Sequence, residues 1–527
     1  MRKRNITICV STAAIAVALL AGGNCAWAEA PDGDFTIDGI SYFRENNVDA
    51  KGPFCFLRYI HDSAGLNVIV PEEVFGERVA VIDMYPIGGN HGDPDPTIEN
   101  TTMERLVLPK TIERIINDGE PYNQIFSGCT ALKSVSVDPE NQYFSDIDGI
   151  LFRNNDGVKY ATLMCCPPEI DLAETFELPT TTSKIGSYAF KGVKSLEYLF
   201  VPKTVESVDY SGITNNPALR YLEAEGDTKM RSGACESNPT LREIRLGDGV
   251  SLSAYAFTDC PELVKAKLPS DLTGLQALAF NGTRVMFLNL PSAVRLGQES
   301  VGAPQAVLLG SSCMLEEDWI DCYANRPLVL CCLSEEPPVI NPVSPSVDHK
   351  DCKPTITLYV PEKSISKYRA DSYWSVHAKE ILPISPALIP LVSEPQLNME
   401  EGWTHEYLWD VMPIGGAVSE SDGEWSVADP TVASIESDGR LTALKPGRTI
   451  VSFTINDQNG VAYTATSDVV VFEQGGVGEI AEPTGSAVLR DGVYNLHGQR
   501  ISDSTEGLPP GFYIVTKGGK TVKQLLK

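Results

Sequence analysis

A phrase that recurs along the chain constrains its fold more than any other feature of the sequence. "SYAFKGVKSLEYLFVPKTV", which begins at Ser187, returns as "AYAFTDCPELVKAKLPSDL" from Ala254. Residues at one position of the phrase follow one another at steps of 23, 22, 22 and 22, and each opens an apolar pattern at positions one, four and six. A single repeat cannot bury its apolar edge alone, so this regularity indicates a stack of repeats. The aligned residues are Leu196, Leu219, Leu241, Leu263 and Val285.

The same pattern opens at three earlier residues, Met103, Leu132 and Ala173. The step from Leu132 to Ala173 is 41 residues because the segment "DGILFRNNDGVKYATLM" lies within it. Its Asn-Asp-Gly sequence is typical of a tight turn, so the segment predicts a hairpin. A period of about 20 to 29 residues with this apolar pattern is typical of leucine-rich repeats, which predicts one short strand per repeat in a parallel sheet.

Three phrases, "AFKGVKSLEYLFVPKTVESV", "FTDCPELVKAKLPSDL" and "FSGCTALKSVSVD", resemble the BspA-like leucine-rich repeat family of bacterial surface proteins over about residues 99–302. "LYVPEKSISKYRADSYW", from Leu358, resembles the strand-plus-helix terminator of these arrays, so residues 303–388 are expected to hold the C-terminal end of the solenoid and its cap. "LNVIVPEEVFGERVAVIDMYPIGG" resembles a degenerate first repeat within a β-rich N-terminal cap, residues 29–98. A solenoid needs such caps because its end strand otherwise exposes an unpaired edge.

The periodicity changes after Pro390. "EWSVADPTVASIESDGRLTALKPGRTIVSFTI", from Glu424, alternates apolar and polar residues between turn sequences, as a small β-sandwich does. Residues 389–474 resemble the bacterial Ig-like domains of surface adhesins of the invasin and intimin kind. Residues 475–527 hold a linker and a tail, "GVYNLHGQRISDSTEGLPPGFYIVTKGGKTVKQLLK". The tail resembles the C-terminal sorting domains of type IX secretion, which implies an export machinery as partner; a plain terminal β-module is the alternative.

The predicted fold class is therefore mostly β with short helical or irregular connections: a leucine-rich repeat solenoid, an Ig-like β-sandwich and a small terminal β-module. The first 28 residues combine Arg2, Lys3 and Arg4 with the apolar run "ITICVSTAAIAVALLAGG" and "AWA" ending at Ala28. This is the pattern of a secretory signal peptide, and a lipid anchor on Cys25 is the alternative. No other apolar run reaches the ~18 residues of a membrane span. The chain is expected to be secreted or held at the outer-membrane surface.

The charge of the chain argues against a nucleic-acid partner. Residues 1–28 carry three cationic side chains and no acidic one, so their removal would shift the net charge from −28 to −31. Such an acidic surface repels phosphate backbones, whose binding needs Lys and Arg. No sequence feature calls for a cofactor.

The 13 cysteines show no C-x-x-C spacing of the kind that binds metals. Cys129 and Cys260 each follow a Phe by three residues, a repeat position that predicts a buried structural thiol. For the adjacent pairs Cys165–Cys166 and Cys331–Cys332, one member of each pair is expected to point into the core, and redox activity is the alternative.

Signals of catalysis and of metal binding are weak. The loop "GNHGDPDPTIEN" offers His91, Asp93 and Asp95, but these lack a full ligand set and are interpreted as a solvated turn. The chain lacks G-x-S-x-G, H-E-x-x-H and phosphate-loop motifs. A non-enzyme is therefore predicted, although the 70 acidic residues leave a glycosidase-like carboxylate pair open.

The sheet face of the solenoid offers a candidate binding surface. The third and fifth residues of each repeat flank an inward apolar residue and are expected to face solvent. Tyr198, Phe200 and Tyr221 would form one aromatic patch with Arg245, Lys265, Lys267 and Phe287 beside it, or would only support cross-strand packing. The full set of pairs is Arg105/Val107, Ser134/Ser136, Thr175/Glu177, Tyr198/Phe200, Tyr221/Glu223, Glu243/Arg245, Lys265/Lys267 and Phe287/Asn289.

These observations favour a non-catalytic exported surface protein that binds a host protein, matrix component or glycan through this sheet face. Two alternatives stay open. A glycan-acting enzyme could lie in the region from Ala303 to Pro354, which shows no repeat pattern. The chain could also be a structural spacer without a ligand.

Overall fold

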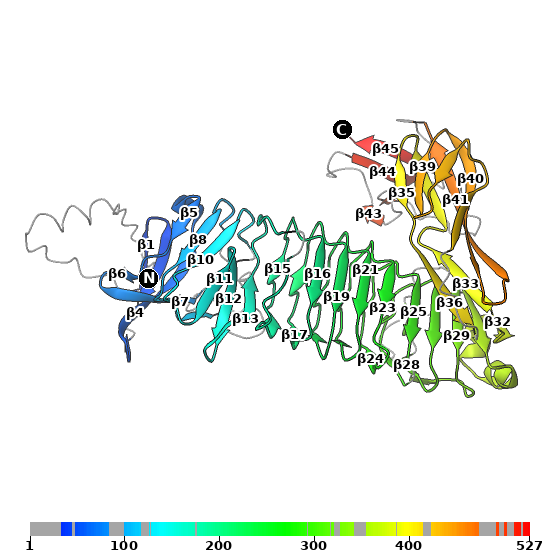
Figure 1. Ribbon diagram of the computed structural model, residues 1–527, viewed down its shortest axis with the longest axis horizontal. Coiled ribbons are helices and arrows are strands. Elements are labelled where there is room, and N and C mark those ends of the chain that lie inside the picture. Colours follow the sequence, from blue (N-terminus) through cyan, green and yellow to red (C-terminus); the bar gives the residue numbers. More distant parts are fainter. Residues whose placement is uncertain are drawn as a thin grey trace, which may run out of the picture.

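The computed structural model shows a β-solenoid of about 12 turns followed by an Ig-like β-sandwich, so the predicted fold class is confirmed (Figure 1). The chain is mostly β with short helices. The structure describes residues 33–44, 48–83, 100–116, 126, 128–173, 176–291, 293–316, 318–320, 327–341, 355–385, 387–414 and 423–473, and the backbone of 492–494, 500–502, 511–517 and 520–526. The predicted signal peptide lies outside these residues.

One face of the solenoid is a stack of parallel strands, here called the first ladder. It has three successive sheets, and all of their strand pairs are parallel. The strands are β5 (Asn67–Ile69), β8 (Arg105–Leu108) and β10 (Ser134–Val137); β16 (Tyr198–Val201), β19 (Tyr221–Ala224), β21 (Glu243–Leu246) and β23 (Lys265–Lys267); then β25 (Phe287–Leu290), β27 (Ala306–Leu309), β29 (Pro327–Cys332), β31 (Thr355–Val360) and β32 (Ala378–Pro383).

Each main repeat also adds a second strand on another face, so the prediction of one strand per repeat is wrong. A second apolar pair follows the repeat proline, such as Val205 and Val208, and both members are fully buried. Burying this pair brings the chain into a second parallel stack, the second ladder. Its strands are β14 (Lys184–Ile185), β17 (Ser207–Val208), β20 (Lys229–Met230), β22 (Ser251–Leu252), β24 (Gly274–Leu275), β26 (Arg295–Leu296), β28 (Met314–Glu316) and β30 (Val339–Asn341). A third short pair joins β15 (Phe190–Lys191) to β18 (Ile213–Thr214).

The hairpin predicted within the long early step is confirmed. Strands β12 (Ile150–Asn155) and β13 (Val158–Cys165) pair antiparallel, and β11 (Phe144–Ile147) pairs with β12. Asp156 and Gly157 form the turn with φ of 48° and 83°, the left-handed values that such a tight turn requires. Because β13 pairs in parallel with β14, the hairpin also opens the second ladder.

Two predictions about the repeat array are wrong. Ala173 is exposed and lies on no strand, because the segment between Ile170 and Leu178 bridges the hairpin to the next turn; its neighbour Glu177 is exposed too. The first ladder is accordingly interrupted between β10 and β16. The region from Ala303 to Pro354 is not irregular in its described part, since it contributes β27 and β29 to the first ladder and β28 and β30 to the second.

The aligned leucines of the repeat form the interior of the solenoid, as the spacing predicts. Leu196, Leu219, Leu241 and Leu263 are each at most 1% exposed and belong to one continuous core. A short polar ladder crosses this core at Asn216 and Asn238. The Asn216 Nδ2 donates to the Asn238 Oδ1 at 3.1 Å, and the Asn238 Nδ2 donates to the Ile213 carbonyl at 2.8 Å. These amides satisfy backbone groups that the tight turns leave unpaired.

The tight turns have a recurrent left-handed residue. Tyr188, Ser211, Gly233, Tyr255 and Leu278 occupy this position in successive turns, with φ between 47° and 64°. Only Gly takes this conformation without steric cost. The tyrosines of the two repeated phrases thus stand at a strained corner of the fold.

The two ends of the solenoid differ. At the N-terminal end lies a seven-stranded sheet with mixed pairing. At the other end a strand is followed by short helices, as the phrase from Leu358 predicts, and Tyr368 and Trp374 from these helices are fully buried in the solenoid core. The N-terminal elements are β1 (Gly33–Ile37), β2 (Ile40–Arg44), β3 (Val48–Asp49), β4 (Gly52–Ile60), η1 (Asp62–Ala64), β6 (Glu73–Val74), β7 (Glu77–Asp83) and β9 (Arg114–Ile116), and the C-terminal helices are η3 (Glu362–Ser364), α2 (Ile365–Ala370) and α3 (Trp374–His377).

The Ig-like domain has its own core around Phe453, Tyr407 and Leu441. It rises from the C-terminal end of the solenoid (Figure 1). Its sheets comprise β33 (Ala387–Val392) with β36 (Trp409–Ile414); β34 (Gln396–Glu400), β41 (Ala462–Phe472), β40 (Gly447–Asn456) and β37 (Glu424–Val427); and β35 (Thr404–Glu406), β39 (Arg440–Ala443) and β38 (Ala433–Ile435). The tail forms an antiparallel sheet of β42 (Gly492–Tyr494), β43 (Arg500–Ser502), β44 (Gly511–Lys517) and β45 (Lys520–Leu526).

Candidate functional site

The outward residues of β16, β19 and β21, together with Lys267 of β23, form the surface that we call the open face. Two columns run across these strands in parallel register. One column holds Tyr198, Tyr221, Glu243 and Lys265, and the other holds Phe200, Glu223, Arg245 and Lys267. Because neighbouring strands are about 4.8 Å apart, residues next to each other in a column form a contiguous surface.

The two tyrosines are the most exposed apolar side chains on the open face. Tyr198 is 40% and Tyr221 39% exposed, while Phe200 is half-buried. Partial burial and the neighbouring Glu223 carboxylate raise the pKa of Tyr198, so its hydroxyl stays protonated and can donate a hydrogen bond. Tyr198 and Tyr221 are therefore adjacent exposed aromatic residues, and Phe200 lies on the same strand as Tyr198.

The cation beside this patch is already paired. The Arg245 Nε donates to Glu243 at 2.7 Å, and its NH1 donates to Glu223 at 3.2 Å. The hydrogen bond to Glu243 is the main reason that the pKa of Arg245 is raised. The open face therefore carries a locally balanced charge cluster rather than the free cation that the sequence indicates.

The Ig-like domain covers the outward residue Phe287 of the next strand, β25, whereas Asn289 of the same strand stays exposed. Phe287 is only 8% exposed, so its predicted position on an open surface is wrong. It packs with Met286 and Ala306 of the solenoid against Leu391 and Met412 of the Ig-like domain. The physical reason is that the antiparallel pair of strands β33 and β36 lies on β25 and β27 and removes their apolar side chains from water.

Lys265 marks the border between the open and the covered strands. Its Nζ lies 5.6 Å from the centroid of the Trp409 ring, a cation–π contact. Trp409 itself stacks on Phe453 in the core of the Ig-like domain, with ring centroids 4.7 Å apart. Lys265 is thus used within the chain, and only Lys267 of the predicted lysine pair is exposed.

Ion pairs surround the contact between the two domains, which we call the joint. Arg242 NH1 lies 2.8 Å from a Glu406 oxygen, and Arg284 NH2 lies 3.1 Å from Glu394 Oε1. The His405 Nε2 contacts the second Glu394 oxygen at 2.8 Å. Burial alone would raise the pKa of Glu394, but His405, and then Ser393 and Arg284, hold that pKa below its ordinary value. Glu394 is therefore an ionised, buried member of the joint.

The cysteines in the described part of the chain are structural. The nine described cysteines are buried thiols. Burial raises the pKa of Cys129 and of Cys260 to about 12, so neither forms a thiolate at neutral pH, and the structural interpretation of both is confirmed. One member of each adjacent pair, Cys166 and Cys332, lies in the main solenoid core as expected. The other members, Cys165 and Cys331, are buried as well, each in a different apolar cluster.

No group of three metal-binding side chains occurs among the described residues, and His91, Asp93 and Asp95 lie outside them. Within the same part of the chain, no helix is long and apolar enough to span a membrane. The described strands of the region from Ala303 to Pro354 carry interior residues such as Leu328 and Leu330 of the solenoid.

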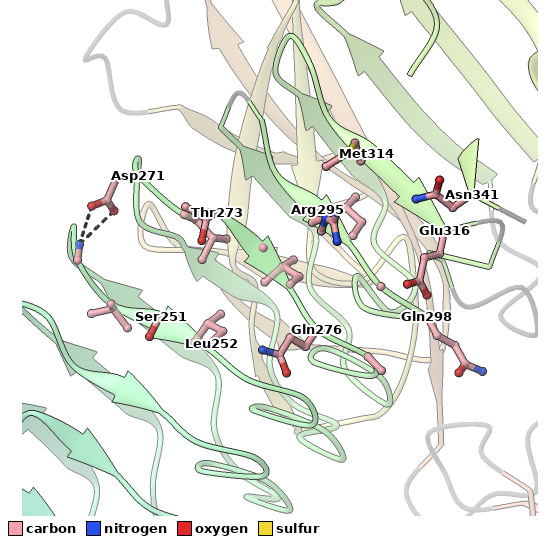
Figure 2. Close-up of a pocket in the computed structure, with 18 of the residues that line it drawn as sticks. Ser251, Leu252, Asp271, Thr273, Gln276, Arg295, Gln298, Met314, Glu316 and Asn341 are labelled. Carbon is pink, nitrogen blue, oxygen red and sulfur yellow. Dashed lines mark hydrogen bonds between the residues drawn. The ribbon is translucent and has the colours of Figure 1, made fainter. Parts of the chain in front are cut away.

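A hollow of about 660 Å³ lies on the second ladder and was missed by the sequence analysis (Figure 2). It spans β22 to β30, and Ser251, Gly274, Gln276, Arg295 and Glu316 are among the residues around it. The recurrent apolar pair after the repeat proline was the signal for this ladder. A comparison of the sizes of the outward side chains along this ladder would have located the hollow.

Comparisons with known families agree with the two main resemblances. The sequence model of the BspA type leucine-rich repeat region matches residues 169–286 in six copies, and that of the group 2 bacterial Ig-like domain matches residues 415–465. The solenoid thus contains BspA-type leucine-rich repeats, and the sandwich contains a bacterial Ig-like domain.

Similarity to individual proteins is partial. A polysaccharide lyase 8 family protein, HylA, of Enterococcus faecalis is 34% identical over 70 residues, which are 13% of this chain and 5% of that protein. A leucine-rich repeat protein of Eubacterium ventriosum is 20% identical, with 38% of this chain and 57% of that chain covered and a TM-score of 0.29. One of Bacteroides ovatus is 15% identical, with 67% and 100% covered and a TM-score of 0.34. This chain therefore spans little of the lyase and just over half of the first solved structure.

Proposed function

We propose that this chain is a non-catalytic cell-surface protein that binds a macromolecular ligand, a protein or a glycan, through the open face. The observation that carries the proposal is the pair Tyr198 and Tyr221, which are adjacent in register and 40% and 39% exposed. Tyrosine offers a large contact area with a polar tip and loses little conformational entropy on binding. Exposed aromatic residues at the centre of a surface are typical of binding hot spots.

The surroundings of the tyrosines fit this role. Glu223, Glu243 and Arg245 hold one another in place, so a ligand would meet polar groups whose geometry is already arranged. The Ig-like domain stands over β25 and β27 and limits the footprint of a ligand on that side. The ligand surface would then extend from β21 toward β16.

The proposed location rests on the interpretation of the first 28 residues and of the terminal β-sheet. In this proposal the first 28 residues direct export and are removed after Ala28, and the terminal β-sheet is the sorting domain read by a type IX-like export machinery. The group 2 Ig-like match supports a surface protein. Sequencing the N-terminus of the protein recovered outside the cell tests the first step, and a chain that lacks residues 475–527 but still reaches the surface would contradict the second.

The binding experiment screens the purified chain against extracellular-matrix proteins and a glycan array, then measures variants with the best ligand. Tyr198→Ala and Tyr221→Ala should each weaken binding by about thirtyfold, a loss of ~2 kcal/mol. Ser136→Ala, exposed on β10 of the same ladder, is the matched control and should change affinity little. Equal affinity of wild type and the Tyr198/Tyr221 double variant would move the site elsewhere, and a chain that binds no probe would be a spacer.

A further inference from the structure

The hollow on the second ladder exists because small residues interrupt a row of larger ones. The outward row of this ladder reads Lys229, Ser251, Gly274, Arg295 and Met314 along β20, β22, β24, β26 and β28. Ser251 and Gly274 thus leave a gap in this row next to the long side chain of Arg295. Four strand spacings separate β22 from β30, so the hollow runs for about 19 Å across the solenoid.

The backbone does not require glycine at the centre of this gap. Gly274 has no left-handed φ, and an added Cβ would meet only the Arg295 carbonyl oxygen at 3.3 Å and the Arg295 Cβ at 3.6 Å. The turn glycines differ, because Gly302 has a φ of +62° and an added Cβ there would lie 2.2 Å from the Phe280 carbonyl oxygen. The main consequence of Gly274 is therefore open space above the strand.

Polar side chains without internal partners surround this space. Figure 2 shows Arg295, Gln298 and Glu316 around the hollow. Within the described residues, none of these three side chains has a hydrogen bond or an ion pair, although Arg295 and Glu316 lie on adjacent strands. Together they offer a planar guanidinium donor, a carboxylate acceptor and an amide that is both donor and acceptor.

The composition of the hollow selects among ligand classes. Asp227, Asp271 and Glu316 outnumber Arg295, the single cation of the lining, so a polyanion would be repelled. The leucines of the floor, such as Leu275, are buried and leave no apolar pocket for the side chains of a peptide. The polar side chains of the hollow need a ligand that offers both hydrogen-bond donors and acceptors. A linear ligand with many uncharged hydroxyl groups does so, because each hydroxyl both donates and accepts a hydrogen bond.

We propose that this hollow is a second binding site, for a neutral linear glycan held by hydrogen bonds to Gln276, Arg295, Gln298 and Glu316. It is separate from the open face, because it lies on the other ladder of the solenoid. Its occupant is a run of several neutral sugars, laid across strands β22 to β30.

The test uses the full chain and calorimetric titration with neutral hexasaccharides of β-1,4-glucan, α-1,4-glucan, β-1,4-mannan and β-1,4-xylan. Hexagalacturonate is the anionic comparison. At least one neutral probe should bind, and hexagalacturonate should bind at least tenfold more weakly. Gly274→Gln, which fills the gap, and Arg295→Ala should each reduce affinity at least tenfold. Thermal melts of both variants exclude loss of folding as the cause.

Two controls separate this proposal from the first one. Lys229→Ala removes an exposed side chain of the same row outside the hollow and should leave the affinity for the glycan unchanged. The Tyr198/Tyr221 double variant should also bind the glycan normally. The proposal is overturned if no neutral probe binds, if hexagalacturonate binds best, if Gly274→Gln and Lys229→Ala behave alike, or if the tyrosine variant abolishes binding.

Discussion

The open and the covered parts of the first ladder are built alike but face different surroundings. Tyr221 and Phe287 occupy the same position of their repeats, three strands apart, yet one is 39% and the other 8% exposed. The difference comes from the antiparallel pair of strands β33 and β36, which packs on β25 and β27. An aromatic residue on a repeat surface can therefore serve a ligand or a neighbouring domain, and its place in the repeat does not tell which.

The largest expected effect separates these two aromatic residues directly. Phe287→Ala should lower the free energy of unfolding by ~3–5 kcal/mol, because the substitution leaves a cavity in the joint. Tyr221→Ala should change it by less than ~1 kcal/mol, since the ring is half in water already. Denaturant unfolding of both variants measures the difference. Equal losses of unfolding free energy in the two variants would contradict the distinction between open and covered strands.

The next effect concerns the interior beneath the open face. Leu241 is fully buried and stacked between Leu219 and Leu263, so Leu241→Ala should cost ~2–5 kcal/mol and lower the melting temperature. Lys267→Ala, exposed on the neighbouring strand, should melt like the wild type. An unchanged melt for Leu241→Ala would mean that the repeat leucines do not carry the stability of the solenoid.

A smaller effect should appear at low pH in the joint. The pKa of Glu394 is below its ordinary value in the folded chain, so the folded state binds fewer protons there than the unfolded state. Its contribution to stability is therefore complete above the ordinary pKa and is lost as the pH falls through the lowered one. Glu394→Gln should flatten this acid loss, measured as unfolding free energy between about pH 5 and pH 2. Glu401→Gln, beyond the joint, is the comparison, and the same slope in both variants would contradict the role of Glu394.

The smallest expected effect tests the turns that both ladders share. Tyr255 has a φ of 61° and is 42% exposed. Tyr255→Gly should relieve the left-handed strain and stabilise the chain by up to ~1 kcal/mol. Ser253→Gly, two residues earlier without a left-handed φ, should destabilise by a similar amount because glycine only adds flexibility there. A lower melting temperature for both variants would show that the backbone at Tyr255 is not strained.

Much of the fold was predictable because the interior repeats with the sequence. Leucines at a fixed step, such as Leu219 and Leu241, predicted the first ladder, and the Asn-Asp-Gly turn predicted the hairpin of β12 and β13. The second ladder was missed because strands such as β17 are only two residues long, too short to show alternation. Ala173 has the right spacing but too little apolar surface to hold a strand in place.

The candidate site was predicted only in part, for a different reason. Sequence position correctly placed Tyr198 and Tyr221 on an exposed strand face. It could not show that Phe287 is covered by Leu391 and Met412, or that Lys265 contacts Trp409, because these partners are more than a hundred residues away in sequence. The hollow around Gly274 depends on side-chain size compared across adjacent turns, which becomes visible only when their register is known.

The joint fixes the direction in which the tyrosines face. A domain joined by a flexible linker can change its orientation. Here the contact of Phe287, Leu391 and Met412, with its surrounding ion pairs, resists rotation between the solenoid and the Ig-like domain. If the chain is attached to a surface through its C-terminal part, the Ig-like domain would be a rigid connection between that surface and the solenoid. The solenoid would then be presented at one angle to its surroundings, and every copy on the same surface would offer its tyrosines with the same orientation.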